Sequence, residues 1–500
     1  MLQTLKNAWK TKEIKSKIIF TLFILVLYRI GTVIPVPFVE ANNFAGSFSG
    51  TILDYMNTLS GNALGTATLF ALGVSPYINA SIIIQLLGVV FPKLGELAKN
   101  DKEKMNFITR VVTVALAIIT AIGYYFLLKN NGALTNAALP DHNDMFWFYG
   151  IVIVACYCAG ASIIMWLAER INERGIGNGI SMILFANIVS SLPSLFYGLG
   201  KLVVSTYSYG SDAKSYIEEG LNYNKAAWAY GLVSTLFAVA MIVALVALTV
   251  FVIFITGSER RIPVQYAKRV VGRKMYGGQS SNIPLKLNMT GVMPIIFASS
   301  IVSLLPTILT LCGVSAATAG FWGTVYKIFG SDGVVYPVLL FLFIIGFAYF
   351  YTAMTFDPME VSNNLKKQGG AIPGIRQGRP TADYIKRILN KVTIVGALFL
   401  GIIAVLPVIS GPHLINPLVQ WIVDGSPSSV WAAENITNYS DFYSYYYASI
   451  IQQSNANTVA SLTSSFTFGG TSLLIVVGVA IETFRELEAQ LTMRNYKGFL

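Results

Sequence analysis

The chain has 500 residues, of which 54% are hydrophobic and only 12% are charged. A soluble domain carries about 25% charged residues, so this composition excludes an ordinary soluble enzyme, a disordered protein and a disulfide-rich secreted scaffold. The formal net charge is +11, and positive residues of a membrane protein gather on one side of the bilayer. The composition therefore predicts an integral membrane protein.

Ten apolar windows are long enough to cross a bilayer core of about 30 Å as helices. They lie at 18–37, 68–92, 106–128, 146–168, 179–200, 230–256, 288–311, 335–356, 391–410 and 467–481. Only helices or closed barrels satisfy the backbone in lipid, and these runs are too long and continuous for the strands of a barrel. We therefore predict an all-α polytopic membrane protein with ten transmembrane helices.

The N-terminal apolar run follows several lysines and so resembles a signal peptide. It is longer than a signal sequence, and no small-residue cleavage site follows it, so we interpret it as an uncleaved first span. Lys and Arg are concentrated in the N-terminal segment, in the loops after the even-numbered spans and in the C-terminal segment. This distribution predicts a multi-pass protein with both termini in the cytoplasm.

The predicted spans carry few reactive groups. No Asp or Glu falls inside them, and Arg29 is their one fully internal charge, since Arg110 and Lys391 lie near the ends of their windows. Ion-coupled transporters, in contrast, place ionisable groups near the midplane. The chain has no G-x-x-x-x-G-K-[ST] loop for nucleotide phosphates. Cys156, Cys158 and Cys312 lie in or beside apolar stretches, where we expect buried free thiols. We expect no enzyme activity, no metal and no other cofactor.

Five stretches are long and specific enough to indicate a family. They read FALGVSPYINASIIIQLL at 70–87, ERGIGNGIS at 173–181, PLKLNMTGVMPIIFASS at 284–300, PGIR at 373–376 and FGGTSLLI at 468–475. Together they resemble the bacterial SecY family, the channel-forming subunits of the Sec protein translocase. The resemblance implies a passive gated pore in the bacterial plasma (inner) membrane. Unfolded secretory polypeptides would cross through it, and membrane-protein helices would leave it sideways into lipid.

The resemblance also implies two pseudosymmetric five-helix halves around a central hourglass pore. In chain order we expect an N-terminal half at 1–200, an outer hinge loop at 201–229 and a C-terminal half at 230–500, which carries cytoplasmic loops at 257–287 and 357–391 and an outer loop at 408–466. That outer loop is longer than the family pattern. It either caps the outer pore mouth or contacts another envelope protein.

The resemblance assigns six apolar side chains to the pore constriction. They are Val74, Ile78, Ile180, Leu184, Ile296 and Ile475. The first four form two i,i+4 pairs, so each pair shares one helix face. An apolar constriction excludes ions because it offers no ligands to replace their hydration shells. Without the resemblance, the same residues are ordinary interhelix or lipid-facing aliphatics.

Residues 51–66 resemble the family's plug, a short half-helix that blocks the outer funnel. The residues assigned to it are Thr51, Ile52, Leu53, Asp54, Tyr55, Met56, Asn57, Ser60, Gly61, Asn62, Gly65 and Thr66. Its glycines and polar residues predict a weakly stable helix, as a segment that must move requires. The alternative is an amphipathic helix on the membrane surface.

A lateral gate is implied between spans two and three and spans seven and eight. Gln85, Thr109 and Asn288 match its polar residues. Hydrogen bonds between uncharged groups on membrane helices are worth about 0.6–2 kcal/mol, weak enough to open when an apolar signal helix competes. The alternative is ordinary interhelical hydrogen bonding.

The two long cytoplasmic loops are basic. The family docks either the SecA motor ATPase or the ribosome there, and the matching residues are Arg273, Lys274, Lys366, Lys367 and Arg376. Basic patches bind RNA phosphates with strong salt dependence. The alternative is that these charges only set the topology, although loops of this length are not needed for that.

Further partners follow from the same resemblance. They are SecE and SecG in a heterotrimer, signal peptides and nascent chains, membrane lipid, and SecDF and YidC. Two other functions stay open: a secondary transporter with broken helices and an assembly scaffold with no conduit. The absence of Asp and Glu from the predicted spans argues against the transporter.

Overall fold

The computed structural model describes residues 6, 8–40, 52–135, 146–212, 223–266, 269–271, 274–276, 280–314, 318, 320–330, 333, 335–410 and 469–497. The predicted outer loop at 408–466, apart from its first three residues, lies outside this part of the chain. So do Thr51 and Arg273. The side chains of Ile52, Asp54, Tyr55 and Lys274 also lie outside it.

The N-terminal part of the chain is helical. Its helices are α2 (Lys12–Gly31), α3 (Ile52–Leu59), α4 (Ser75–Val90), α5 (Pro92–Asn100), α6 (Lys102–Asn130), α7 (Phe146–Arg174) and α8 (Gly179–Asp212). The C-terminal helices are α9 (Tyr223–Gly257), α10 (Met293–Leu311), α11 (Phe321–Phe329), α12 (Val335–Thr355), α13 (Pro358–Lys367), α14 (Arg379–Ser410) and α18 (Gly469–Lys497).

Each of the ten predicted windows holds one of these helices. In the described part of the chain, seven helices are long and apolar enough to cross a membrane, namely α6, α7, α8, α9, α10, α12 and α14. The apolar helix α4 has 16 residues and is shorter than a full span. The chain is therefore a multi-pass helical membrane protein, and the number of ten crossings stays a prediction.

Two predicted spans begin later than the hydropathy suggests, and for the same reason. Gly73 and Gly291 have φ values of +56° and +66°, and the helices α4 and α10 begin two residues after them. Pro76 and Pro294 then occupy the first turn of each helix, where a proline costs no hydrogen bond. Residues 68–74 and 288–292 lie inside the predicted windows but are not helical.

The predicted hinge loop at 201–229 is helical at both ends in the described residues. Helix α8 continues to Asp212 and α9 begins at Tyr223. Apolar residues such as Leu202 and Val203 extend the helical pattern beyond the predicted end of the span, which explains the difference.

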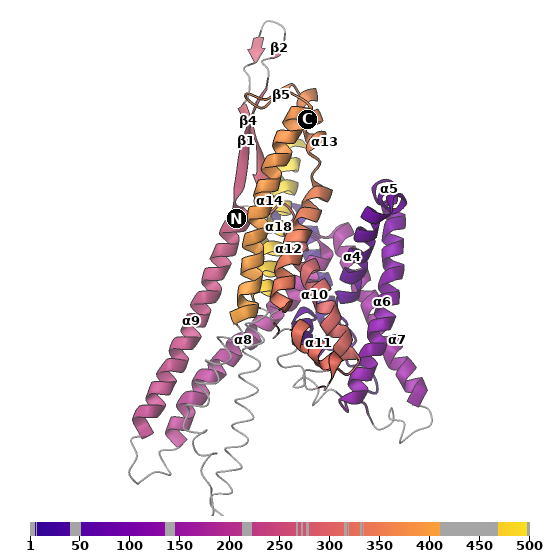
Figure 1. Ribbon diagram of the computed structural model, residues 1–500, viewed down its shortest axis with the longest axis vertical. Coiled ribbons are helices and arrows are strands. Elements are labelled where there is room, and N and C mark those ends of the chain that lie inside the picture. The colour runs from indigo at the N-terminus through magenta and orange to yellow at the C-terminus, as the bar shows by residue number, and fades with distance from the viewer. Residues whose placement is uncertain are drawn as a thin grey trace, which may run out of the picture.

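The helices form two groups side by side (Figure 1). Helices α4, α6 and α7 pack against one another on one flank, and α8 packs against α9 on the opposite flank. Helices α10, α12, α14 and α18 lie between these two flanks. A large buried cluster contains residues from α2, α4, α7 to α10, α12, α14 and α18, so the core runs through both parts of the chain.

Two small sheets, which the sequence analysis did not predict, lie in the loops at one end of the molecule. β4 (Ser280–Lys286), β1 (Glu259–Tyr266) and β5 (Gly370–Ala371) form one antiparallel sheet in that order. β2 (Arg269–Val271) and β3 (Lys274–Tyr276) form a hairpin that projects beyond it (Figure 1).

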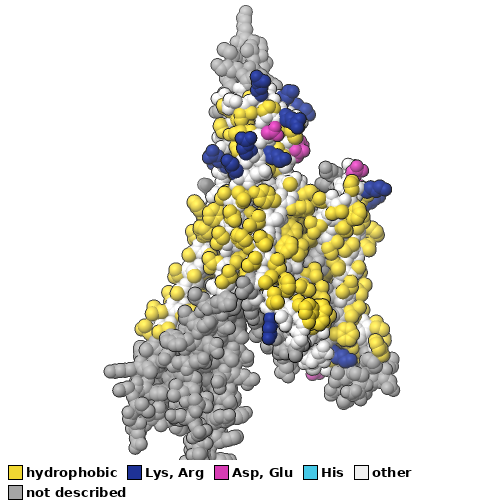
Figure 2. Space-filling view, viewed as in Figure 1, with side chains coloured by type: hydrophobic (Ala, Val, Ile, Leu, Met, Phe, Trp, Pro, Cys, Tyr) yellow, Lys and Arg dark blue, Asp and Glu magenta, His cyan; other side chains and the backbone are white. Residues whose placement is uncertain are grey.

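The surface divides into an apolar flank and a charged end. Figure 2 shows hydrophobic side chains over the helices, with Lys and Arg gathered at the end that carries the sheets. On α9, for example, Phe254 is 72% exposed and Val250 is 60% exposed. Apolar patches of this extent mark a surface covered by lipid or by another protein.

Candidate functional site

The structure brings the six predicted constriction residues together. Val74 precedes α4, and Ile78 lies on its first turn. Leu184, Ile296 and Ile475 come from α8, α10 and α18, and all five side chains are at most 3% exposed within one cluster. Ile180 is partly buried and packs against the same cluster. The aliphatic side chains therefore close the space between helices of both chain halves.

One further aliphatic side chain of the same cluster was not assigned from the sequence. Val292 precedes α10 as Val74 precedes α4, with nearly the same backbone conformation, and it is 1% exposed in the same cluster. The pattern G-V-x-P at 73–76 recurs at 291–294. This repeat was the available signal, since it pairs Val74 and Ile78 with Val292 and Ile296.

A cavity of about 160 Å³ lies beside these residues, between α3, α4, α6 and α10. Ile78, Leu184, Ile296 and Ile475 contribute to its wall. The remaining lining is mainly aliphatic, with hydroxyl groups from a run of serines and a threonine on α10. The cavity is an apolar space that borders both the constriction and the short helix α3.

Helix α3 coincides with the predicted plug but ends at Leu59, and turns follow as far as residue 74. It packs against α8 and α10. Leu53 is 2% exposed, and Thr307 of α10 donates a hydrogen bond to the Met56 sulfur over 3.5 Å. The helix therefore lies inside the bundle, which contradicts the alternative of a helix on the membrane surface.

The predicted polar residues of the plug make local bonds that close the turn after α3. The Gly65 amide donates to Asn57 Oδ1 over 2.8 Å, and the Leu64 amide donates to Ser60 Oγ over 3.1 Å. Thr66 donates its hydroxyl hydrogen to the Asn62 carbonyl over 2.9 Å. These bonds hold the turn without extending the helix.

Arg29 lies in the last turn of α2, which ends at Gly31. Helix α2 ends two residues after Arg29, because the apolar residues after Gly31 lengthen the predicted window without extending the helix. A cation in the last turn is stabilised by the helix dipole. Of the three cysteines, Cys156 and Cys158 are half-buried and Cys312, just beyond α10, is exposed rather than buried.

One of the three predicted gate residues bridges two helices. Gln85 of α4 accepts a hydrogen bond at Oε1 from the hydroxyl group of Tyr351 on α12, and its Nε2 donates to Ser81 over 3.0 Å. Asn288 is buried, and its Oδ1 has no partner among the described residues.

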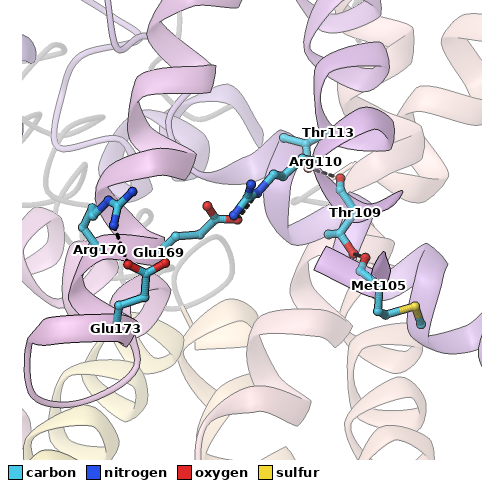
Figure 3. A network of polar contacts seen from close by, with 7 residues as sticks. All are labelled: Met105, Thr109, Arg110, Thr113, Glu169, Arg170 and Glu173. Atoms are coloured by element: carbon cyan, nitrogen blue, oxygen red, sulfur yellow. Dashed lines mark hydrogen bonds and ion pairs between the residues drawn. The ribbon is translucent and has the colours of Figure 1, made fainter. Parts of the chain in front are cut away.

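Thr109 makes its side-chain hydrogen bond within its own helix and not across the predicted lateral gate. Its hydroxyl donates to the Met105 carbonyl one turn earlier in α6 over 3.0 Å (Figure 3), a bond that Thr commonly makes inside helices. The neighbouring Arg110 instead joins α6 to α7 through an ion pair of 2.9 Å with Glu169 (Figure 3).

The two basic loops form one structural unit. Strands β1 and β4 come from the first loop and β5 from the second, and Gln265 pairs with Ala371 between them. Beneath the sheet, Ile262, Leu285 and Ile385 belong to a separate small core. The sequence gives no sign of this pairing, because a strand of two residues has no recognisable pattern.

The basic side chains of this unit face outward. Lys366 and Lys367 are exposed at the end of α13, and Arg376 is exposed before α14. Among the described basic residues of both loops, Arg261 alone forms an ion pair, with Glu259. At the base of the unit, burial lowers the pKa of Lys286, and nearby Arg485 lowers it further.

These features define a class of protein. The structure is that of a helical membrane protein with a buried cluster of aliphatic side chains between its helices and a short helix packed inside the bundle. The family model described as SecY matches residues 68–423. Curated relatives named Protein translocase subunit SecY, from Streptomyces coelicolor and Mycobacterium tuberculosis, are each 37% identical over the whole of both chains. The chain therefore belongs to the SecY family.

Solved structures share the fold. One described as a protein conducting channel has a TM-score of 0.54 and 16% identity, covering 95% of this chain and 92% of the other. Sec61 from a canine ribosome-channel complex has a TM-score of 0.51 with the same identity and coverage. A structure that addresses how the SecY plug domain stabilises the closed state has a TM-score of 0.53 and 17% identity.

Proposed function

We propose that this chain is the channel-forming subunit of a bacterial Sec translocase. It forms a passive gated pore through which unfolded polypeptides cross the plasma membrane and from which apolar helices leave sideways into lipid. The observation that carries the proposal is the full-length family match together with a buried aliphatic constriction bordered by the short helix α3.

The constriction residues form the seal. The six predicted side chains and Val292 are all aliphatic, so an ion that enters finds no group to replace its water shell. Aliphatic side chains also form no directional bonds with particular residues of a polypeptide that passes through. A seal of this kind closes around polypeptides of any sequence.

Helix α3 is the plug, and the seam between α4, α6, α10 and α12 is the lateral gate. The cavity between α3, α4, α6 and α10 lies at this seam, and its apolar lining suits an apolar signal helix. The hydrogen bond between Tyr351 and Gln85 holds the seam until such a helix competes with it.

The unit formed by β1, β4, β5 and α13 docks the motor or the ribosome on the cytoplasmic side, where both termini also lie. Its basic side chains, including Lys366, Lys367 and Arg376, supply positive charge for SecA or for ribosomal RNA phosphates, together with Arg273 and Lys274 of the first basic loop. SecE and SecG complete the heterotrimer. SecDF and YidC are further partners. The halves 1–200 and 230–500 form the two sides of the channel.

Site-specific crosslinking tests the pore. A photoreactive residue at Ile78 or Ile296 should give adducts with a stalled secretory chain, because both side chains line the proposed path. A probe at Val250, on the exposed face of α9, is the matched control and should give none. Absence of adducts at both Ile78 and Ile296 would contradict the proposal.

A further inference from the structure

The turns that follow α3 are held by side chains from four other helices. Backbone carbonyls in such turns have no partners from regular secondary structure and need donors from elsewhere. The bonds run from Asn187 Nδ2 to Leu59 (2.7 Å), from Arg29 Nη1 to Gly61 (3.1 Å), from the Tyr124 hydroxyl to Leu64 and from the Tyr157 hydroxyl to Ala67 (3.2 Å). The donors belong to α8, α2, α6 and α7.

The two tyrosines form the rigid part of this arrangement. Tyr124 and Tyr157 are at most 1% exposed, and their rings meet edge to face with centroids 5.0 Å apart. Both donate to carbonyls in the middle of the segment 60–74, which leads into α4. A buried aromatic pair of this kind has little freedom to move.

Arg29 and Asn187 bind near the start of this segment, where α3 finishes. Arg29 is exposed, and its long side chain reaches the Gly61 carbonyl from the last turn of α2. Asn187 is fully buried, donates a second bond to the Tyr28 hydroxyl oxygen over 2.8 Å, and has no partner for its Oδ1 in the described structure. A buried amide with an unsatisfied oxygen costs free energy. We therefore expect the two hydrogen bonds that Asn187 Nδ2 donates to have a specific role, which is to hold the end of α3.

These two side chains close directly over the Gly61 backbone. A Cβ atom at Gly61 would lie 2.7 Å from Arg29 Nη1 and 2.8 Å from Asn187 Oδ1. Gly61 has a φ of +70°, and Asn62 follows with a φ of +69°. Two successive left-handed residues make a sharp corner, which glycine and asparagine tolerate best.

We infer that Arg29 and Asn187 are positioning residues that latch α3 in the closed channel, while Tyr124 and Tyr157 anchor the segment behind it. Opening breaks the bonds to Leu59 and Gly61, together with the local bonds that join Asn57 and Ser60 to the Gly65 and Leu64 amides. It leaves the tyrosine bonds to Leu64 and Ala67 intact, so α3 swings about Gly61 and Asn62. This inference rests on the proposed role of α3 as the plug.

The test measures resting ion conductance of the full chain, purified with its bound subunits and reconstituted in a planar bilayer. Arg29→Gln and Asn187→Leu should each raise it about tenfold, the change in a two-state population that loss of one charged or buried hydrogen bond produces. Arg29→Lys, which retains a charged donor on a long side chain, should restore most of the seal. Arg170→Gln, at a half-buried arginine paired with Glu173, is the control and should change nothing.

The position of α3 is read out separately. In a chain without native cysteines, a short thiol crosslinker should join Met56→Cys to Thr307→Cys efficiently, because these side chains meet in the closed structure. Arg29→Gln should lower that yield at least threefold without changing the thermal stability of the protein. A purely structural arginine would change stability and leave the yield intact.

Deletion of residues 52–59 separates the two hypotheses. If the deleted channel does not leak, α3 is not the plug and the proposed function is at fault. If it leaks while Arg29→Gln and Asn187→Leu keep wild-type conductance and crosslinking, the latch is overturned alone. Arg29→Gln should add no leak to the deleted channel, and an additional leak would also overturn the latch.

Discussion

Tyr351 of α12 donates a hydrogen bond to Gln85 of α4, although the two residues are 266 positions apart in the sequence. Gln85 is oriented by its own bond to Ser81, and the ring of Tyr351 lies 5.2 Å from that of Phe297 on α10. Both partners are therefore held in place by their neighbours. This uncharged bond therefore joins α4 to α12 along the seam.

Replacing Tyr351 with Phe removes this bond and keeps the ring packing. If the seam is the lateral gate, opening becomes easier by about 0.6–2 kcal/mol, so a precursor with a shortened signal sequence should be exported about 3- to 30-fold faster. Export into inverted membrane vesicles is the measurement. Tyr349→Phe is the matched control, because the Tyr349 hydroxyl bonds to the Asn390 carbonyl of α14 and not across the seam. Unchanged export in Tyr351→Phe would argue against a gate here.

The constriction makes a second prediction. Ile296 is 2% exposed, and Ile296→Ala would leave a gap among the constriction side chains. Resting ion leak should rise at least about threefold, because the apolar barrier widens and wets more easily. Ile402→Ala makes the same change on α14 at a side chain that is 50% exposed, and its leak should match the parent protein. Equal leak in both variants would show that Ile296 does not line a conduit.

Hydropathy located the helices but not their first residues. Windows two and seven extend over non-helical segments, because an apolar scale does not register the left-handed Gly73 and Gly291. A comparison of the two windows with each other would have found the repeated G-V-x-P pattern and, with it, Val292. Internal repeats of this kind carry backbone information that composition lacks.

The contacts between distant segments were harder to predict. Gln85 was identified as a gate residue, but its partner Tyr351 was not, because a tyrosine in an apolar helix gives no sign of which helix it faces. Thr109 has the right polarity and satisfies it within its own helix. The sheet that joins the two basic loops depends on the two-residue strand β5, which is shorter than any periodic signal.

Gly478 of α18 supplies a stability prediction. A Cβ atom there would lie 2.1 Å from Val292 Cγ1, so Gly478→Ala should displace Val292 and lower stability by about 1–3 kcal/mol. Gly346→Ala on α12 is the control, since nothing lies within 4 Å of its Cβ position and the change should stabilise the helix by about 0.5–1 kcal/mol. Thermal unfolding in detergent measures both. A stabilising effect of Gly478→Ala would contradict the close packing of α10 on α18.

Arg376 tests the docking unit. Its side chain is exposed in the loop between β5 and α14, and the Thr381 hydroxyl holds the turn by donating to the Arg376 carbonyl over 2.7 Å. That bond uses the backbone, so Arg376→Glu should leave the fold intact. It should reduce SecA-driven export about tenfold or more, as expected when a central arginine of an interface reverses its charge. Arg170→Glu, which breaks an exposed ion pair with Glu173 outside the unit, should export nearly normally because such pairs contribute little. Normal export by Arg376→Glu, with wild-type amounts in the membrane, would mean that the basic loops set topology and do not dock the motor.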